Sequence, residues 1–489
     1  MAVSPGRRSK NFKKSTVSNR SPATSAKSPA GPSGLCCHLI DLYSLFAIFK
    51  LMKKAVFGVV LFILFVVVAY LFWSDFGLIK KFTGNNAPEL KETEIGGDLS
   101  FLNLPDGFKI SVVAENFDGP RVILFDAKGR MLVSETKAGR VSVLDPSATD
   151  SFENKRVLID GLKSPHGLDF YTDPKTKMTY LYIAETHQVA RYPYDVKTGK
   201  IADKIGANIA NLPADGNHFT RAIAFGPNYR KEPIVQGQSA NTFSATKLYI
   251  SVGSSCDTCT ENTWKRAAIL ESDPEGTYTA EFAGGLRNSV FFAFHPLTKE
   301  IWATEMGRDN LGDNLPPDEI NIVKVAGPED KFGAKRFGWP FCYGNKVRDK
   351  KFNPDEWERI DVTDDCGKTE APVIEIQAHS APLGLAFVPS GKGWPKEWGG
   401  DLLVALHGSW NRSEPVGYKI VRYDLDASGK VFSSEPKDFV SGWLPTNNQK
   451  LVTKNQFYGR PVDLKFGPDG MLYVSDDTVG VVYRINLEK

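Results

Sequence analysis

One pattern of apolar and polar positions recurs along the chain from residue 120 to its end. Each copy holds an apolar strand that ends in Phe, a turn with Gly or Pro, a second apolar strand and usually a third. There are six copies, and their phenylalanines are Phe125, Phe170, Phe225, Phe294, Phe387 and Phe466. Short strands repeated with turn residues between them are typical of a β-propeller, whose sheets are arranged in a ring. The pattern predicts an all-β, six-bladed propeller.

A further strand-like segment precedes the first copy. Residues 108–115, FKISVVAE, alternate as a strand does, so we expect them to complete the last blade and close the ring. The propeller is expected over residues 106–489, after a linker over residues 76–105. The spacing of the repeated phenylalanines is widest between Phe294 and Phe387, which indicates long loop insertions. Since binding and catalytic residues concentrate on loops, we expect the function there.

An uncharged apolar run of 19 residues covers positions 55–73. A helix needs about 20 such residues to cross a bilayer, so the run predicts a transmembrane helix. Lys53 and Lys54 precede it and no small-residue cleavage site is evident after it. We therefore expect a transmembrane signal anchor over residues 52–75 that holds the propeller on the periplasmic, extracytoplasmic side. A cleaved signal peptide is the alternative.

The residues before the apolar run differ from the rest of the chain. Residues 1–51 are rich in Ser, Pro and Lys, and Met52 begins a complete export signal, so we expect a disordered extension or a start of translation at Met52. An intact mass that lacks residues 1–51 is the expected result. The residues before position 55 carry a formal charge of +9 and the whole chain +3, which leaves −6 for the remainder. A mildly acidic body argues against nucleic-acid binding.

Four cysteines lie in the part of the chain that is expected to be exported. In an oxidising compartment disulfides are the default, and we expect pairs 256–259 and 342–366 among Cys256, Cys259, Cys342 and Cys366. A single Cys-x-x-Cys does not make a zinc site, and Thr260 rather than His follows it, which argues against covalent haem.

Polar residues occupy corresponding places in the six copies. In an antiparallel blade, the start of the first strand and the end of the second lie at one end of the sheet, so these residues face one mouth of the ring. The strand starts carry Arg121, His166, His218 with Arg221, Arg287 with Asn288, His379 and Arg460, and the strand ends carry Glu135, Glu185, Ser254, Glu305, His407 and Asp476. Such a mouth suits a small polyanion and a hard cation such as Ca²⁺. The alternative is that these residues pair with one another and seal the blade edges.

Several longer segments carry a family resemblance over about residues 100–489. They are GNHFTRAIAFGP with KLYISVGSSCDTC, GGLRNSVFFAFHP, ATEMGRDNLGDNLPPDEINIV with FGWPFCYG, HSAPLGLAF with HGSWNRSEPVGYKIVRYDL, and GRPVDLKFGPDGMLYVSDD. Together they resemble the pyrroloquinoline quinone (PQQ) dependent glucose/sorbosone dehydrogenases. The resemblance implies a PQQ- and Ca²⁺-dependent oxidoreductase that oxidises a sugar, a sorbosone-like aldehyde or a polyol and passes electrons to an external quinone or cytochrome.

The resemblance also implies roles for individual residues. His218 matches the histidine that removes the substrate hydroxyl proton. Arg287 and Asn288 match a pair at the cofactor, where Arg287 holds a carboxylate and stabilises charge on the reduced quinone. Arg460 matches an arginine that clamps another cofactor carboxylate. Gly307 and Arg308 fall where backbone carbonyls bind Ca²⁺.

The chain departs from the family at several of these places. Met306 stands where the family has a Gln at the cofactor, Ser254 where well-known members have an Asp, and Asn217 where they have another acid, so the substrate stays open. His379 and His407 are expected to line the cofactor pocket. The acidic residues Asp309, Asp313, Asp318 and Glu319 form either a further metal site or solvated loop carboxylates.

Two other functions compete with this interpretation. A Ca²⁺-dependent lactonase or esterase uses carboxylates at the mouth of a propeller to hold a metal that activates water. Such sites depend on acids rather than on arginines, so Arg287 and Arg460 favour a carboxylated cofactor. A non-catalytic binding propeller is the third possibility, because fold does not imply function.

Overall fold

The structure is a computed structural model, and it describes residues 91–92, 99–148, 151–230, 245–327, 330, 333–352, 366–447, 450–451 and 457–488. The chain divides into two units, Met1–Asn85 and Asn86–Lys489, and all described residues belong to the second. The extension over residues 1–51, the expected transmembrane segment over 52–75 and most of the linker lie outside the described residues. Within the described ranges, no helix is long and apolar enough to span a membrane.

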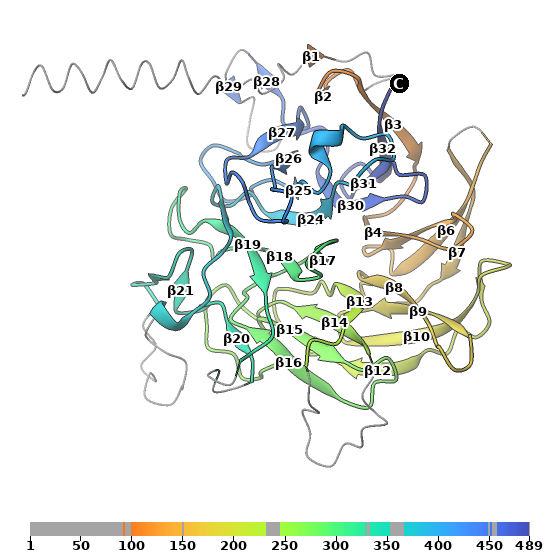
Figure 1. Cartoon of the computed structure of the whole chain (residues 1–489), viewed down its shortest axis with the longest axis horizontal. Helices are drawn as coiled ribbons and strands as arrows, with labels where there is room; N and C mark the ends of the chain where they lie inside the picture. Colours follow the sequence, from red (N-terminus) through yellow and green to blue (C-terminus); the bar gives the residue numbers. More distant parts are fainter. Residues whose placement is uncertain are drawn as a thin grey trace, which may run out of the picture. The chain divides into compact units, whose positions relative to one another are not determined.

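Six antiparallel sheets make up the fold, and each corresponds to one copy of the sequence pattern (Figure 1). Blade one contains β4 (Pro120–Phe125), β5 (Met131–Glu135), β6 (Arg140–Pro146) and β7 (Phe152–Ile159). Blade two contains β8 (Leu168–Thr172), β9 (Thr179–Ala184), β10 (Gln188–Asp195) and β12 (Ala207–Asn211), with β11 (Lys200–Ile201) also paired to β10. Blade three contains β13 (Ile223–Pro227), β14 (Thr246–Val252), β15 (Ala268–Ser272) and β16 (Thr279–Gly284), with β20 (Lys335–Arg336) added in parallel.

The second half of the ring repeats this arrangement. Blade four contains β17 (Phe292–Phe294), β18 (Ile301–Glu305), β19 (Asp318–Val323) and β23 (Ile374–Ile376). Blade five contains β24 (Pro382–Phe387), β25 (Leu402–Leu406), β26 (Lys419–Tyr423) and β27 (Lys437–Val440). Blade six contains β30 (Pro461–Phe466), β31 (Leu472–Asp476), β32 (Val481–Leu487) and β3 (Phe108–Ala114). The predicted six-bladed propeller is confirmed.

Short two-stranded pairs and 3₁₀ turns decorate the ring. They are β1 (Lys91–Glu92) with β2 (Asn103–Leu104), β21 (Cys342–Tyr343) with β22 (Val347–Arg348), β28 (Thr446–Asn447) with β29 (Lys450–Leu451), and the turns η3 (Cys366–Lys368) and η4 (Lys396–Trp398). The end of the expected linker is already part of the packed structure, since Leu102 and Leu104 are fully buried against blades five and six.

The first strand of every blade lies next to the centre of the ring (Figure 1). A cavity of about 460 Å³ runs between these strands and is lined by residues from all six of them, among them Val122, Leu168, Ile223, Phe292, Leu385 and Leu464. The second strands β5, β18, β25 and β31 are buried at every position, because neighbouring blades pack on both of their faces. Continuous apolar runs in the sequence are the result.

The repeated phenylalanine joins one blade to the one before it. In four blades it meets an aromatic side chain of the preceding blade's second strand edge to face, in the pairs Phe125–Tyr473, Phe225–Tyr182, Phe294–Tyr249 and Phe387–Trp302. Edge-to-face pairs add about 0.5–1.5 kcal/mol to the burial of the rings. The repeat seen in the sequence is therefore a packing signal between blades.

The ring is closed by the N-terminal strand of the propeller. β3 pairs antiparallel with β32, with Phe108 opposite Leu487 and Ile110 opposite Ile485. The outer strand of blade six thus comes from the opposite end of the chain, which confirms the expected closure.

Candidate active site

The acids at the ends of the second strands are used to hold their own blades together. Each accepts the backbone N–H of a residue near the start of the first strand, at 2.8 Å (Asp118 to Glu135), 2.6 Å (Lys163 to Glu185), 3.0 Å (Asn288 to Glu305) and 2.9 Å (Arg460 to Asp476). Burial raises the pKa of Glu305 to about 8 and that of Asp476 to about 7, which makes both poor ligands for a cation. These four acids therefore hold their own blades together, but they do so through backbone N–H groups rather than by pairing with the other polar residues of the mouth.

Blades three and five have no acid at this position, and there the side chain faces the predicted site. Ser254 in blade three lies beside His218, and His407 in blade five lies beside Asp477, with Nε2 2.9 Å from Oδ1. The two blades that lack the acid therefore place Ser254 and His407 next to other predicted site residues instead.

His218 presents one free ring nitrogen. Its Nδ1 lies 2.9 Å from the carbonyl oxygen of Ser254 and 3.0 Å from the Ser254 hydroxyl. A carbonyl oxygen can only accept, so Nδ1 carries the proton and Nε2 keeps its lone pair. Within the described part of the chain Nε2 has no hydrogen-bond partner. This tautomer is the one that a general base at Nε2 requires.

The surroundings of His218 keep the imidazole neutral. Burial and then the charge of Arg287 lower the pKa of His218 to about 4. At neutral pH almost every molecule therefore has a proton-accepting Nε2.

This electrostatic coupling gives a first prediction. In the chain without cofactor, the His218 ring should titrate near pH 4, and Arg287→Met should move the titration upward because it removes a nearby positive charge. Long-range ¹H–¹⁵N NMR of the imidazole nitrogens measures both values. A midpoint at pH 6.5 in both proteins contradicts this account of the pocket.

Arg287 is surrounded by acceptors of the protein itself. Its Nε donates to the Asp257 carbonyl at 2.9 Å, and Nη2 donates to the carboxylates of Asp257 at 2.9 Å and Asp309 at 3.3 Å. Nη1 donates to the carbonyl oxygens of Gly307 at 2.9 Å and Met306 at 3.3 Å. The fork expected to hold a cofactor carboxylate thus already carries two protein carboxylates, and its role at the cofactor stays a prediction.

The residues expected at the cation offer the predicted carbonyls. Within the described residues the Arg308 carbonyl oxygen accepts no hydrogen bond, and the Gly307 oxygen accepts only the one from Arg287, which leaves it a second lone pair. The Arg308 side chain points elsewhere, since Nη1 donates to Asp349 at 2.8 Å. Asn288 Nδ2 lies 3.5 Å from the sulfur of Met306, so these two expected cofactor contacts touch each other.

A second group of charges lies around Asp477. This carboxylate accepts from Arg121 at 2.6 Å and from His407 at 2.9 Å, and Arg460 donates to the His407 carbonyl at 2.9 Å. Burial acts to raise the pKa of Asp477, but His407 and Arg121 hold it below its ordinary value. Burial lowers the pKa of His407 to about 4. Arg460 also lies 5.3 Å from the ring centre of Tyr418.

Two loops meet across the mouth between these groups. His379 Nε2 lies 2.9 Å from the Gly312 carbonyl, and the side chain of Asn411 donates to the carboxylate of Asp309. Ser413 donates to the carboxylate of Asp313, and Arg412 donates to the backbone carbonyl of the same residue. Residues 309–313 are thereby tied to residues 411–413 of blade five. Because residues 407–408 of the same loop accept the hydrogen bonds of Arg460, one continuous network connects Arg460 to Arg287.

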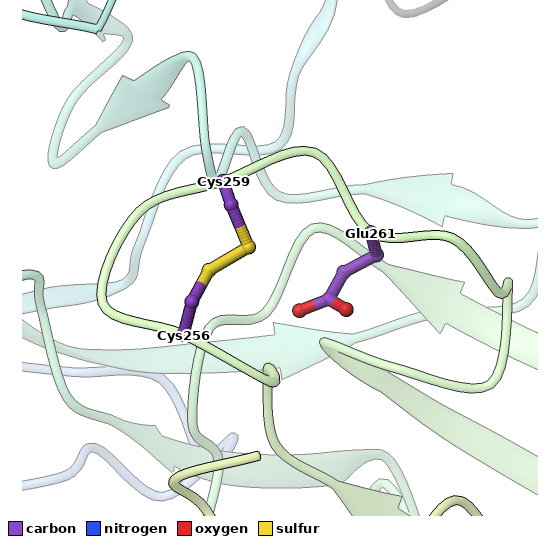
Figure 2. Close-up of side chains that lie close together, drawn as sticks. All are labelled: Cys256, Cys259 and Glu261. Atoms are coloured by element: carbon purple, nitrogen blue, oxygen red, sulfur yellow. A yellow bond between two sulfur atoms is a disulfide. The ribbon is translucent and has the colours of Figure 1, made fainter. Parts of the chain in front are cut away.

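In the described part of the chain, no three side chains of the acidic stretch come close enough together to hold a metal ion, so a further metal site there has no support. Asp318 and Glu319 are buried in β19 rather than solvated in a loop, and they accept backbone N–H groups of Gly307, Ala381 and Gly344. Among the described residues, only Cys256, Cys259 and Glu261 place three metal-binding atoms close together. Figure 2 shows that the two sulfur atoms are bonded to each other, so this group is not a metal site.

Both expected disulfides are present, Cys256–Cys259 and Cys342–Cys366. The first closes a short loop (Figure 2). This loop contacts Arg287 directly and His218 through Ser254. The Ser254 hydroxyl beside His218 donates to the Cys256 carbonyl at 2.6 Å, while Asp257 inside the loop holds Arg287. The loop therefore fixes the position of His218 and Arg287 relative to each other.

The two disulfides should differ in what they contribute, which gives a second prediction. Removing the Cys342–Cys366 disulfide, whose cysteines are 24 positions apart, should lower the free energy of unfolding by about 3 kcal/mol. Removing the Cys256–Cys259 disulfide, whose cysteines are three positions apart, should lower it by about 2 kcal/mol, because a shorter loop restricts the unfolded chain less. The paired Ser variants should show the reverse order in activity, since only the shorter loop holds His218 and Arg287. Urea unfolding and turnover measure the two effects, and equal activities contradict the assignment.

Comparison with known proteins identifies the family of this chain. A family model described as TrAA12-like matches residues 102–488. The chain belongs to this family. A TrAA12-like relationship agrees with the resemblance to PQQ-dependent sugar dehydrogenases that the sequence motifs show, and that resemblance is confirmed.

Two proteins of similar sequence and one solved structure are compared with this chain. An uncharacterized protein of Borreliella burgdorferi is 30% identical over 80% of this chain and 92% of its own length. A pyrroloquinoline quinone-dependent pyranose dehydrogenase of Coprinopsis cinerea is 29% identical over 78% of this chain, which spans only 54% of that relative. A calcium structure of the Trichoderma reesei carbohydrate-active enzyme family AA12 has the same fold, with a TM-score of 0.62 and 21% identity over 81% of this chain and 99% of that one.

The mouth has unsatisfied polar atoms that suit a carboxylated, carbonyl-rich group. Buried atoms without a partner among the described residues include Arg121 Nε, His166 Nε2 and Asn411 Oδ1, and each belongs to the mouth. Arg121 Nε is positioned to donate, whereas His166 Nδ1 faces the Arg221 carbonyl at 3.3 Å, so that His166 Nε2 keeps its lone pair. In the described part of the chain, His218 Nε2 is free to accept a proton and the Arg308 carbonyl is free to bind a cation. The residues present therefore fit PQQ with Ca²⁺.

Sequence reasoning missed two residues of this site. Asp257 lies inside the Cys-x-x-Cys motif, which we read only as a disulfide, and its contact with Arg287 spans 30 positions. Asp477 follows the strand-end acid of blade six, and only this copy has two adjacent acids there. The doubled acid was a usable signal, because Asp476 alone suffices to hold the blade.

Proposed function

We propose that this TrAA12-like protein is a PQQ-dependent oxidoreductase that oxidises a sugar, a sugar aldehyde or a polyol with the help of Ca²⁺. The observation that carries the proposal is His218, whose neutral ring presents a free Nε2 beside a mouth that also holds Arg287 and Arg460. The named pyranose dehydrogenase among its relatives supports the same cofactor.

The residues at the mouth divide the work of such a reaction. A bound PQQ would supply the hydride acceptor, and a bound Ca²⁺ would supply a Lewis acid. His218 Nε2 accepts the proton of the substrate hydroxyl, while Ser254 fixes the ring by its two contacts with Nδ1. The groups that would hold the cofactor are Arg287, Arg460, Arg121 and Asn288, with Met306 beside Asn288 and with His379 and His407 at the rim. The carbonyls of Gly307 and Arg308 would be the cation ligands.

The carboxylates at the mouth argue against a lactonase or esterase. Such an enzyme needs several acids around one cation, but in the described part of the chain Glu135, Glu185, Glu305 and Asp476 each hold backbone groups of their own blade. Asp309 and Asp257 are paired with Arg287.

Reconstitution tests the proposal. The full chain is supplied with PQQ and Ca²⁺, and reduction of a dye is followed with a panel of aldoses, sorbosone and polyols; the same reactions without PQQ are the control. We expect dye reduction that depends on PQQ and on at least one sugar. Absence of reduction with every substrate, despite binding of PQQ, argues for a non-catalytic propeller.

We also propose that the apolar run over residues 55–73 anchors the propeller on the extracytoplasmic face of a membrane, where an external quinone or cytochrome accepts the electrons. The uncharged run and the two disulfides support this location. Cell fractionation should find the protein in the membrane pellet, and removal of residues 55–73 should release it. Recovery of the intact protein from the soluble fraction contradicts the anchor.

A further inference from the structure

A separate pocket of about 270 Å³ lies next to the predicted active site. Most of its lining comes from residues 260–267, which follow the Cys256–Cys259 loop, and from residues 336–341, which begin at the end of β20. Pockets for drug-sized ligands begin at roughly 300 Å³, so this one suits a ligand about as large as a single sugar ring. None of the mouth residues assigned to the cofactor or the cation lines it.

Aromatic side chains provide the apolar part of this pocket. Trp264 is 47% exposed, and Trp339, Pro340 and Phe341 line the same space. Flat aromatic faces match the C–H face of a pyranose ring, because both are rigid and apolar. We call this space the tryptophan pocket.

Polar side chains line the same pocket as these rings. Glu281 and Arg336 form a two-pronged pair, with oxygen-to-nitrogen distances of 2.5 and 3.1 Å. The pair is part-exposed in the pocket wall, and the amide of Asn262 is exposed next to Trp264. A carboxylate, a guanidinium and an amide together offer both donors and acceptors, which adjacent sugar hydroxyls require.

The tryptophan pocket shares its wall with the predicted active site. The indole Nε1 of Trp339 donates to the Asp257 carbonyl at 3.2 Å, and Arg287 Nε donates to the same oxygen at 2.9 Å. On the other side, Arg266 lines the pocket and donates to the carbonyl of Gly253 at 3.2 Å, one residue before Ser254. The tryptophan pocket therefore adjoins the predicted active site through Asp257 and Gly253.

We propose that the tryptophan pocket is a second sugar subsite, which binds an inner pyranose of an oligosaccharide while the terminal unit is presented to His218. The inference rests on the proposed sugar oxidation and extends it from monosaccharides to oligosaccharides as the substrate class. Trp264 carries most of the contact with the inner ring, and Glu281 with Arg336 selects its hydroxyl pattern.

Calorimetric titration of the full chain without cofactor tests the proposal, with glucose, maltose, cellobiose and cellotriose as probes. At least one of the oligosaccharides should bind about tenfold more tightly than glucose. Trp264→Ala should abolish this difference, and Trp264→Phe should retain part of it because a ring remains. Phe432→Ala is the matched control, since Phe432 is an exposed aromatic residue (79%) in the turn between β26 and β27, at the other end of its blade.

The same variants separate this inference from the proposed function. In the reconstituted enzyme, Trp264→Ala should raise KM about tenfold for the preferred oligosaccharide and leave KM for glucose unchanged. Tighter oligosaccharide binding without any dye reduction upholds the subsite and rejects the oxidation. Equal affinity for glucose and all oligosaccharides, or unchanged oligosaccharide affinity in folded Trp264→Ala, overturns the subsite whether or not glucose is oxidised.

Discussion

Replacing His218 with Ala should lower kcat by about 10²–10⁴-fold, the range that a general base contributes. Nε2 is the free proton acceptor of this ring, and the Ser254 contacts hold Nδ1, so the variant removes the acceptor while the backbone partners remain. Stopped dye-reduction assays on the reconstituted enzyme measure the loss, and PQQ titration shows that the cofactor still binds.

A matched substitution keeps this result interpretable. His187→Ala changes a half-buried histidine of blade two that makes none of the contacts described for the site, so its kcat should stay within about twofold of the unmodified chain. Full activity in His218→Ala would reject the assignment of the base even if PQQ binds normally.

Replacing Arg287 with Leu should weaken PQQ binding by about 100-fold and also lower the free energy of unfolding. The substitution leaves the partly exposed carboxylates of Asp257 and Asp309 without their cation, and it frees the carbonyls that position residues 306–307. Removing one partner of a fully buried pair costs about 3–5 kcal/mol, and partial exposure of the two acids reduces this to about 2 kcal/mol. Quenching of tryptophan fluorescence by PQQ and urea unfolding measure the two effects.

Arg230 provides the control for the loss of stability. Its side chain is 15% exposed, pairs with Glu271 at 2.7 Å and donates to two carbonyls, but none of these partners is at the mouth. Arg230→Leu should be destabilised to a similar degree and bind PQQ like the unmodified chain. Equal weakening of PQQ binding in both variants means that Arg287 acts only through stability.

The fold was predictable because one packing contact is repeated along the chain. Phe387 ends a first strand and Phe225 lies within one, and they pack on Trp302 and Tyr182 of the preceding blade, so the spacing of these residues follows the blades directly. The closing strand could be recognised for a related reason: residues 108–115 alternate as a strand but have no partner in the first copy, and they pair with β32.

The sequence predicted which residues lie at the mouth, but only partly which partners their side chains bind. Glu305 and Asp476 lie at the mouth as expected, yet they accept backbone N–H groups, which a repeat pattern alone does not distinguish from metal binding. The contacts of Asp257 with Arg287 and of Asp477 with His407 join residues 30 and 70 positions apart in loops whose paths no local pattern specifies. The resemblance identified His218 and Arg287, but not the disulfide loop that connects them.

The central claim is that the six blades bring His218, Arg287 and Arg460 to one mouth that holds PQQ with Ca²⁺. An experimental structure of the chain after titration with PQQ and Ca²⁺ tests it most directly. We expect density for one planar cofactor within reach of His218 Nε2 and Arg460, with a cation on the carbonyls of Gly307 and Arg308. Cofactor density elsewhere on the propeller, with the mouth empty, would contradict it.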